Sequence, residues 1–139
     1  QAIDLRMELA GACGMGSLFI THDLGVIAQT ADRVAVMYLG RHVETGSVRQ
    51  VIRDPFHPYT RGLIDALPKL SDLDSPLSPI PGDIPSPLNR PKGCVFHTRC
   101  SVAIAGRCER TVPEFVHPGA GHDVACHLAA DQLMQGAAE

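Results

Sequence analysis

The 139-residue sequence has no tryptophan, few aromatic residues and no long apolar run. Aromatic side chains make up only 4% of the chain, so the hydrophobic core that it can build is modest. No apolar run approaches the roughly 20 residues that a helix needs to cross a bilayer. The net charge of −3 provides no positive field for phosphates, so we expect no nucleic-acid partner. The length fits one domain, or one small lobe with an appendage.

The first residues, QAIDLRMELAGACG, lack both a basic segment and a continuous apolar segment. They therefore do not form a signal peptide. A helix-like opening without an initiator methionine indicates a piece of a longer protein. We expect a cytoplasmic location, in which cysteines act as thiols rather than as disulfides.

The first zone, residues 1–68, alternates helical and strand patterns. Its composition predicts a helix through about Leu9, which the following glycines interrupt. The apolar run at 18–20 predicts a short strand covered on both faces. Asp23 can cap a helix over 24–31.

The rest of this zone predicts a hairpin and two helices. Alternating residues from Val34 predict a β-hairpin that turns at Gly40–Arg41 and returns through Thr45. Ser47 and Gln50 match a capping box, which opens a helix that ends before residue 54. A further short helix is expected over 61–67.

Two zones of different composition follow. Residues 69–92 form a connector with many prolines, where neither a helix nor a central strand can continue, so extended backbone is expected. Residues 93–130 form a cysteine-rich module. The small, polar tail at 131–139 is expected to fray.

His22 lies just after the predicted strand, in the segment SLFITHDLG. In an open α/β sheet, ligands gather beyond the carboxyl ends of the strands, so the imidazole would face that crevice. Position alone leaves open that the histidine is satisfied by local backbone.

The stretch FITHDLGVIAQTADRVAVMYLGRHVETG resembles the part of ABC-transporter ATPases that carries the switch histidine. The resemblance implies an α/β fold in which residues 1–68 are the C-terminal end of the ATPase core. It also implies that His22 senses the γ-phosphate of ATP. A neutral imidazole can donate one hydrogen bond to that phosphate, so the contact reports which nucleotide is bound.

The other elements of such a nucleotide site are missing from the sequence. It contains no G-x-x-x-x-G-K-[ST], no LSGGQ-like signature and no apolar run ending in Asp-Glu. Without a phosphate cradle and a magnesium site, phosphoryl transfer loses its main electrostatic stabilisation. We therefore expect this chain alone not to hydrolyse ATP, and ATP with magnesium to bind only in the complete subunit.

Three segments resemble the region that follows the ATPase core in dipeptide and oligopeptide importer subunits. They are DPFHPYTRGLIDALP, IPGDIPSPLNRPKGCVFHTRC and ACHL. The resemblance implies the C-terminal part of an ATP-binding subunit, peripheral to the cytoplasmic face of the membrane. Its implied partners are integral-membrane permease subunits, a second ATP-binding subunit and a peptide-binding protein. For the segment His57-Pro58-Tyr59 we expect a packing role.

Four cysteines, Cys94, Cys100, Cys108 and Cys126, follow a C-x5-C-x7-C-x17-C pattern, whereas Cys13 stands apart as a small hydrophobe. The spacing lacks the C-x2-C pair of most structural zinc sites, although histidines 97, 122 and 127 could replace thiolates. Two disulfides are possible but do not fit a cytoplasmic setting. An iron–sulfur cluster tolerates such irregular spacing.

The resemblance implies that these four cysteines hold a [4Fe–4S] cluster, with zinc as the alternative. The module has few large apolar residues for its length, so a bound metal group would help to order it. Two other functions stay open at this point. One is a stand-alone metal-binding module with a structural or redox-sensing task, and the other is a non-functional truncated product.

Overall fold

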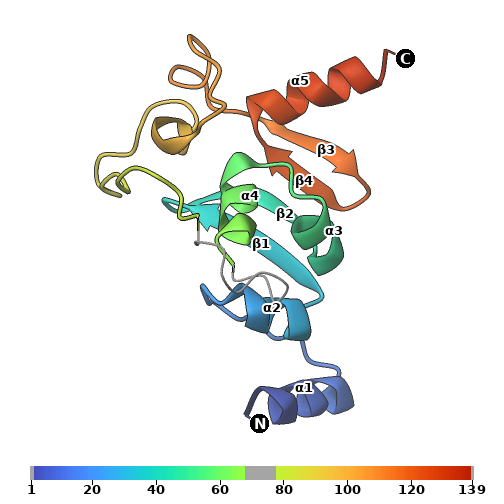
Figure 1. Ribbon diagram of the computed structural model, residues 1–139. Coiled ribbons are helices and arrows are strands. Elements are labelled where there is room, and N and C mark those ends of the chain that lie inside the picture. The colour runs from blue at the N-terminus through green and yellow to red at the C-terminus, as the bar shows by residue number, and fades with distance from the viewer. Residues whose placement is uncertain (1, 68–77, 139) are drawn as a thin grey trace. The chain divides into compact units, whose positions relative to one another are not determined.

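The computed structural model describes residues 2–67 and 78–138 (Figure 1). The chain divides into two compact units, Gln1–Asp32 and Arg33–Glu139. Each unit is described by itself. The expected domain boundaries at residues 68, 92 and 130 stay predictions.

The first unit contains two helices. Helix α1 spans Ala2–Cys13, so it continues past the first of the glycines expected to interrupt it. Helix α2 spans Leu24–Thr30, and its predicted cap is confirmed. The carboxylate of Asp23 accepts hydrogen bonds from the backbone N–H groups of Gly25 and Val26, at 2.9 and 3.2 Å.

The predicted strand at 18–20 is wrong for the structure that the chain adopts here. Residues 15–20 are irregular, and Leu18 and Ile20 are 89% and 94% exposed. A strand needs a neighbour that pairs with its backbone, and no strand in the described ranges pairs with this one. The apolar run indicates a preference for burial but does not supply the partner.

The second unit is built on one four-stranded antiparallel sheet of order β1-β2-β4-β3. Its strands are β1 (Arg33–Tyr38), β2 (Arg41–Ser47), β3 (Phe115–Gly119) and β4 (His122–Ala125). The sequence predicted the first hairpin but not the second. The second hairpin joins the first through pairing of Glu44 with Val124.

The first hairpin turns one residue earlier than expected. Leu39 and Gly40 form the turn with φ of 48° and 76°. Two consecutive positive φ angles are typical of the two-residue turn whose twist suits a hairpin. Along β1, Val34, Val36 and Tyr38 are buried and alternate with exposed residues, as the pattern predicted.

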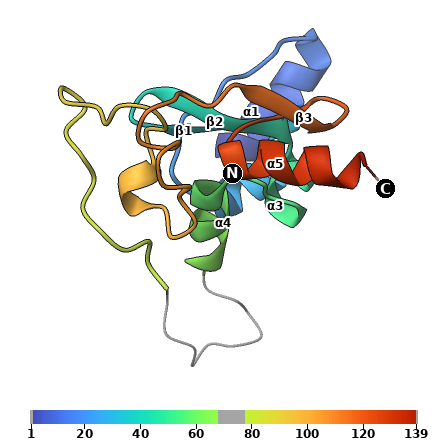
Figure 2. The ribbon, with the colours of Figure 1, turned by 90° about the horizontal axis from the view of Figure 1, so that it is seen from above.

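Helices α3 (Val48–Arg53), α4 (Pro58–Asp65) and α5 (His127–Gly136) lie on one face of this sheet (Figures 1 and 2). The predicted capping box of Ser47 and Gln50 is present. Helix α4 begins three residues earlier than expected, because Pro58 occupies its first turn and His57 caps it.

The expected fraying of the tail is wrong through residue 136, where α5 ends. The tail is rich in alanine, leucine, methionine and glutamine, which favour helix. Arg107 also holds the helix through Asp131, with its Nη1 2.8 and 3.0 Å from the two carboxylate oxygens.

Residues 78–92 contain no helix or strand, as their prolines predicted. The remainder of the predicted connector, up to residue 77, lies outside the described residues. Arg99 donates hydrogen bonds to the carbonyl oxygens of Ile80 and Pro81, at 3.0 and 3.2 Å, and thereby attaches this segment to the cysteine-rich part. Among the described helices, none has the length and apolar character that crossing a membrane requires.

Candidate functional site

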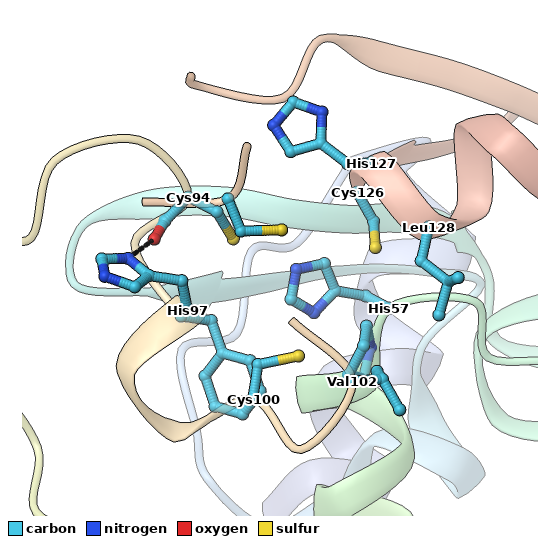
Figure 3. Close-up of a pocket in the computed structure, with 11 residues that line it drawn as sticks. His57, Cys94, His97, Cys100, Val102, Cys126, His127 and Leu128 are labelled. Carbon is cyan, nitrogen blue, oxygen red and sulfur yellow. Dashed lines mark hydrogen bonds between the residues drawn. The ribbon is translucent and has the colours of Figure 1, made fainter. Parts of the chain in front are cut away.

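Four cysteines line one pocket in the second unit (Figure 3). Cys94 follows a glycine turn, Cys100 follows the short 3-10 helix η1 (His97–Arg99), Cys108 lies in a series of turns, and Cys126 caps α5. We call the site that these four residues line the four-cysteine pocket. Cys13 is exposed in the first unit, and all five cysteines are free thiols.

Gly93 allows two of the cysteine-bearing segments to approach each other closely. Its φ is +70°, and a Cβ at this position would collide with the carbonyl oxygen of Cys108 and lie 2.9 Å from the nitrogen of Arg110. The backbone N–H of Cys94 donates to that same carbonyl oxygen at 2.8 Å. The close approach therefore requires glycine.

Backbone N–H groups surround the four sulfur atoms. The N–H of Ile104 donates to the sulfur of Cys108 at 3.3 Å. Those of Phe96 and Val102 favour the thiolates of Cys94 and Cys100, respectively. The backbone N–H groups of Leu128 and Ala129, in the first turn of α5, favour the thiolate of Cys126. Such donors stabilise sulfur that carries negative charge.

Burial acts in the opposite direction and dominates. Burial, with a smaller contribution from the neighbouring cysteines, raises the pKa of Cys94 to about 11. Burial also raises the pKa of Cys100 and of Cys126. The thiols of Cys94, Cys100 and Cys126 are therefore protonated at neutral pH unless a cation compensates for the desolvation of their thiolates. A metal group bound there would supply that positive charge and displace the protons.

The donor set differs from that of a single-ion site. Among the described residues, no three cysteine, histidine, aspartate or glutamate side chains are grouped so that they could hold one metal ion. A tetrahedral zinc–thiolate site brings its sulfurs to about 3.8 Å, given bonds of about 2.3 Å. A four-iron cluster places each thiolate on a different iron and so spaces them farther apart.

The cavity that the four-cysteine pocket encloses is small, about 10 Å³. Cys94 and Cys100 lie on irregular backbone and are partly exposed, whereas Cys108 and Cys126 are buried. The chemistry of four free thiols, with backbone N–H groups directed toward them, fits an iron–sulfur cluster.

Each of the three histidines considered as nitrogen ligands has one ring nitrogen in a hydrogen bond, although His97 and His127 also line the pocket. The Nδ1 of His97 lies 2.8 Å from the carbonyl oxygen of Cys94, and the Nε2 of His127 lies 2.8 Å from that of Thr111. His122 lies on β4 and pairs with Glu44. The four thiols are thus the donors that the fold brings together.

His57 also lines the four-cysteine pocket. The side chain is 1% exposed, and its Nδ1 accepts a hydrogen bond from the backbone N–H of Tyr59 at 3.0 Å. Its Nε2 is buried without a hydrogen-bond partner. Burial lowers the pKa of His57 to about 4, so the ring is neutral at neutral pH. The expected packing role is confirmed, since the ring contacts that of Phe96 at 5.8 Å between centroids.

Sequence reasoning missed a buried carboxylate that supports His57. Glu44 is fully buried, and its two oxygens accept hydrogen bonds from the backbone N–H groups of Phe56 and His57, each at 3.0 Å. The Nε2 of His122 lies 2.7 Å from Oε1 of the same carboxylate. The sequence signal that could have revealed this carboxylate was a glutamate placed among the apolar positions of a predicted strand.

The structure places His22 in the first unit, exposed, between α1 and α2. Its neighbours form a local turn, since the N–H of Asp23 donates to the hydroxyl of Thr21 at 3.1 Å. The side chain contributes nothing to the four-cysteine pocket, which belongs to the other unit.

Residues 43–108 match the family described as "Oligopeptide/dipeptide transporter, C-terminal region". The match begins on β2 and ends at Cys108, so it includes the HPYT segment and three of the four pocket cysteines.

Individual relatives extend the similarity over most of the chain. The oligopeptide transport ATP-binding protein AppF of Bacillus subtilis is 43% identical over 92% of this chain and 40% of its own length. The dipeptide transport ATP-binding protein DppD of Caldanaerobacter subterraneus is 44% identical over 91% of this chain and 38% of its own. For DppF of Haemophilus influenzae, the identity is 41%. The chain thus spans about two fifths of the length of the curated relatives that it matches.

Proposed function

We propose that the chain belongs to the oligopeptide and dipeptide transporter family and acts as the C-terminal part of an ATP-binding subunit that powers peptide transport. The names of its relatives support this role. The partners that follow are integral-membrane permease subunits, a second ATP-binding subunit and a peptide-binding protein. Such a subunit is peripheral, at the cytoplasmic face of the membrane.

Within that subunit, we propose that His22 contacts the γ-phosphate of bound ATP. Its exposure and its fixed place before the capped helix α2 support this role. The sequence holds no phosphate-binding loop and no acidic magnesium site, so the chain alone does not hydrolyse ATP. ATP and magnesium bind in the complete subunit.

For the four-cysteine pocket, we propose a [4Fe–4S] cluster held by Cys94, Cys100, Cys108 and Cys126, with zinc as the alternative. One observation carries this proposal: four free thiols from four separate segments converge, with backbone N–H groups directed toward them. The cluster would supply one-electron redox chemistry and a crosslink between the segments. The chain's own residues bind it, exclude water and hold the thiolates.

Replacement of a pocket cysteine tests the proposal. Protein purified anaerobically is expected to be brown, with absorbance near about 400 nm from sulfur-to-iron charge transfer. Cys108→Ser and Cys126→Ser each remove a buried ligand and are expected to abolish that absorbance. Cys13→Ser, an exposed cysteine outside the pocket, is the matched control and keeps it. Equal absorbance in all variants would exclude these ligands.

The compact second unit favours one other function, that of a metal-binding module which is stable by itself. Residues 33–139 contain the complete four-cysteine pocket and the sheet that supports it. If residues 33–139 bound the cluster but the intact subunit transported peptides equally well without it, the pocket would have a separate task. Loss of transport together with the cluster supports the transport role.

A further inference from the structure

His57 carries a buried polar atom for which the described residues provide no partner. Its ring extends from the beginning of α4 into the four-cysteine pocket and lies near the side chains of Cys100 and Cys126 (Figure 3). The side chain is 1% exposed, and its Nε2 has neither a protein partner nor contact with solvent. A buried polar atom of this kind requires an explanation.

The hydrogen bonds of the ring determine which nitrogen carries the proton. A backbone N–H, that of Tyr59, donates to Nδ1 at 3.0 Å, so Nδ1 must be the unprotonated nitrogen. In the neutral imidazole the proton then resides on Nε2. The unpartnered atom is therefore a hydrogen-bond donor, and it requires an acceptor.

Contacts with Glu44, Pro58 and Phe96 hold this donor in place, and the last two also line the pocket. The backbone N–H of His57 donates to the buried carboxylate of Glu44 at 3.0 Å, and Pro58 restricts the first turn of α4. The ring of Phe96 lies at a centroid distance of 5.8 Å and a tilt of 57°. An N–H···π contact with it would be only a weak substitute for an acceptor. The strong acceptors that remain for this donor are those that the pocket itself would hold.

We propose that the Nε2–H of His57 donates a hydrogen bond to a sulfur of the group that the four cysteines bind. This inference rests on the proposed iron–sulfur function of the pocket. It makes His57 a positioning residue, because it acts on the sulfur and not as a metal ligand. A donor of this kind stabilises the more negative, reduced state and thereby raises the reduction potential.

Two substitutions separate the donor from the helix cap. In His57→Asn, the side-chain oxygen can replace Nδ1 as the cap acceptor, but nothing reaches the position of Nε2. In His57→Gln, the side-chain amide can place an N–H near the position of Nε2. We expect both variants to bind iron and sulfide in wild-type amounts. For His57→Asn, the equilibrium constant of cluster reduction is expected to be about tenfold smaller. This corresponds to a fall of about 59 mV in the reduction potential of a one-electron couple.

The measurement is an anaerobic redox titration of the full chain, accompanied by iron and sulfide analysis. A wild-type potential in fully loaded His57→Asn would overturn the inference, and so would a fall in His57→Gln as large as that in His57→Asn. Wild-type protein without iron and sulfide would instead overturn the proposed function of the pocket. The two failures are therefore distinguishable.

A direct readout applies even if His57→Asn does not fold. In protein labelled with ¹⁵N-histidine, the reduced cluster is expected to show a weak ¹⁵N coupling by electron–nuclear double resonance. That coupling should disappear in loaded His57→Gln, although His97 and His127 remain at the pocket. An unchanged coupling would overturn the inference, and a coupling of the strength of a direct iron–nitrogen bond would make His57 a ligand instead.

Discussion

At the scale of single residues, Gly93 controls whether the pocket can form. It is followed directly by Cys94, whose N–H donates to the carbonyl oxygen of Cys108. The left-handed backbone of Gly93 and its contact with the neighbouring segment both exclude a side chain. The convergence of two cysteines therefore depends on a residue that has no side chain of its own.

We predict that Gly93→Ala destabilises the second unit by at least about 2–3 kcal/mol, since a backbone clash adds to the cost of a positive φ. The measurement is the midpoint of urea unfolding, with metal content determined in parallel. Gly106→Ala is the matched control: φ there is also positive, at +81°, but no atom lies within 4 Å of the added Cβ. That control is expected to lose only about 1 kcal/mol. Equal losses would show that contact with the Cys108 segment is unimportant.

The sequence predicted which residue types matter better than it predicted their surroundings. The four cysteines, set apart from Cys13, were evident from their spacing, and a packing role was expected for the segment His57-Pro58-Tyr59. The tautomer of His57 was not predictable, because it depends on a backbone N–H that points at Nδ1 only when α4 begins at Pro58. The sequence placed the start of that helix three residues later.

At the scale of elements, Glu44 joins three parts of the second unit. It lies on β2, pairs with Val124 of β4, and accepts hydrogen bonds from the two backbone N–H groups that precede α4. His122 completes the group. The position of α4 against the sheet, and hence of His57 in the pocket, depends on this carboxylate.

We predict that Glu44→Gln lowers the free energy of unfolding by about 2–3 kcal/mol, because at least one buried donor loses its acceptor. Thermal or urea unfolding measures the loss. The exposed Glu114→Gln is the matched control, and its effect is expected to stay within about 0.5 kcal/mol. If the two variants were equally stable, the hydrogen bonds of Glu44 would not be what fixes α4.

The sequence predicted elements that depend on neighbouring residues better than elements that depend on distant pairing. Local signals predicted the caps of α2 and α3 correctly, because the residues that form each cap lie within three positions of each other. The second hairpin was missed, because its strands are short and gain their place by pairing with β2, which lies far away in the chain. The strand expected at 18–20 failed for the complementary reason: it has the apolar residues but lacks a neighbour.

At the scale of the whole molecule, the chain comprises two compact units. The first carries His22, and the second carries the four-cysteine pocket. The chain covers about two fifths of its relatives' length, and its sequence lacks the phosphate-binding loop. We therefore propose that nucleotide sensing by His22 belongs to the complete subunit, whereas the proposed metal binding can be tested on the second unit.

Metal and sulfide analysis of the anaerobically purified chain tests the central claim most directly. The account predicts about four iron and four sulfide per chain and little zinc, because four thiols from four segments meet in one pocket. Stoichiometric zinc without iron, or a protein that is stably folded and metal-free, would contradict it.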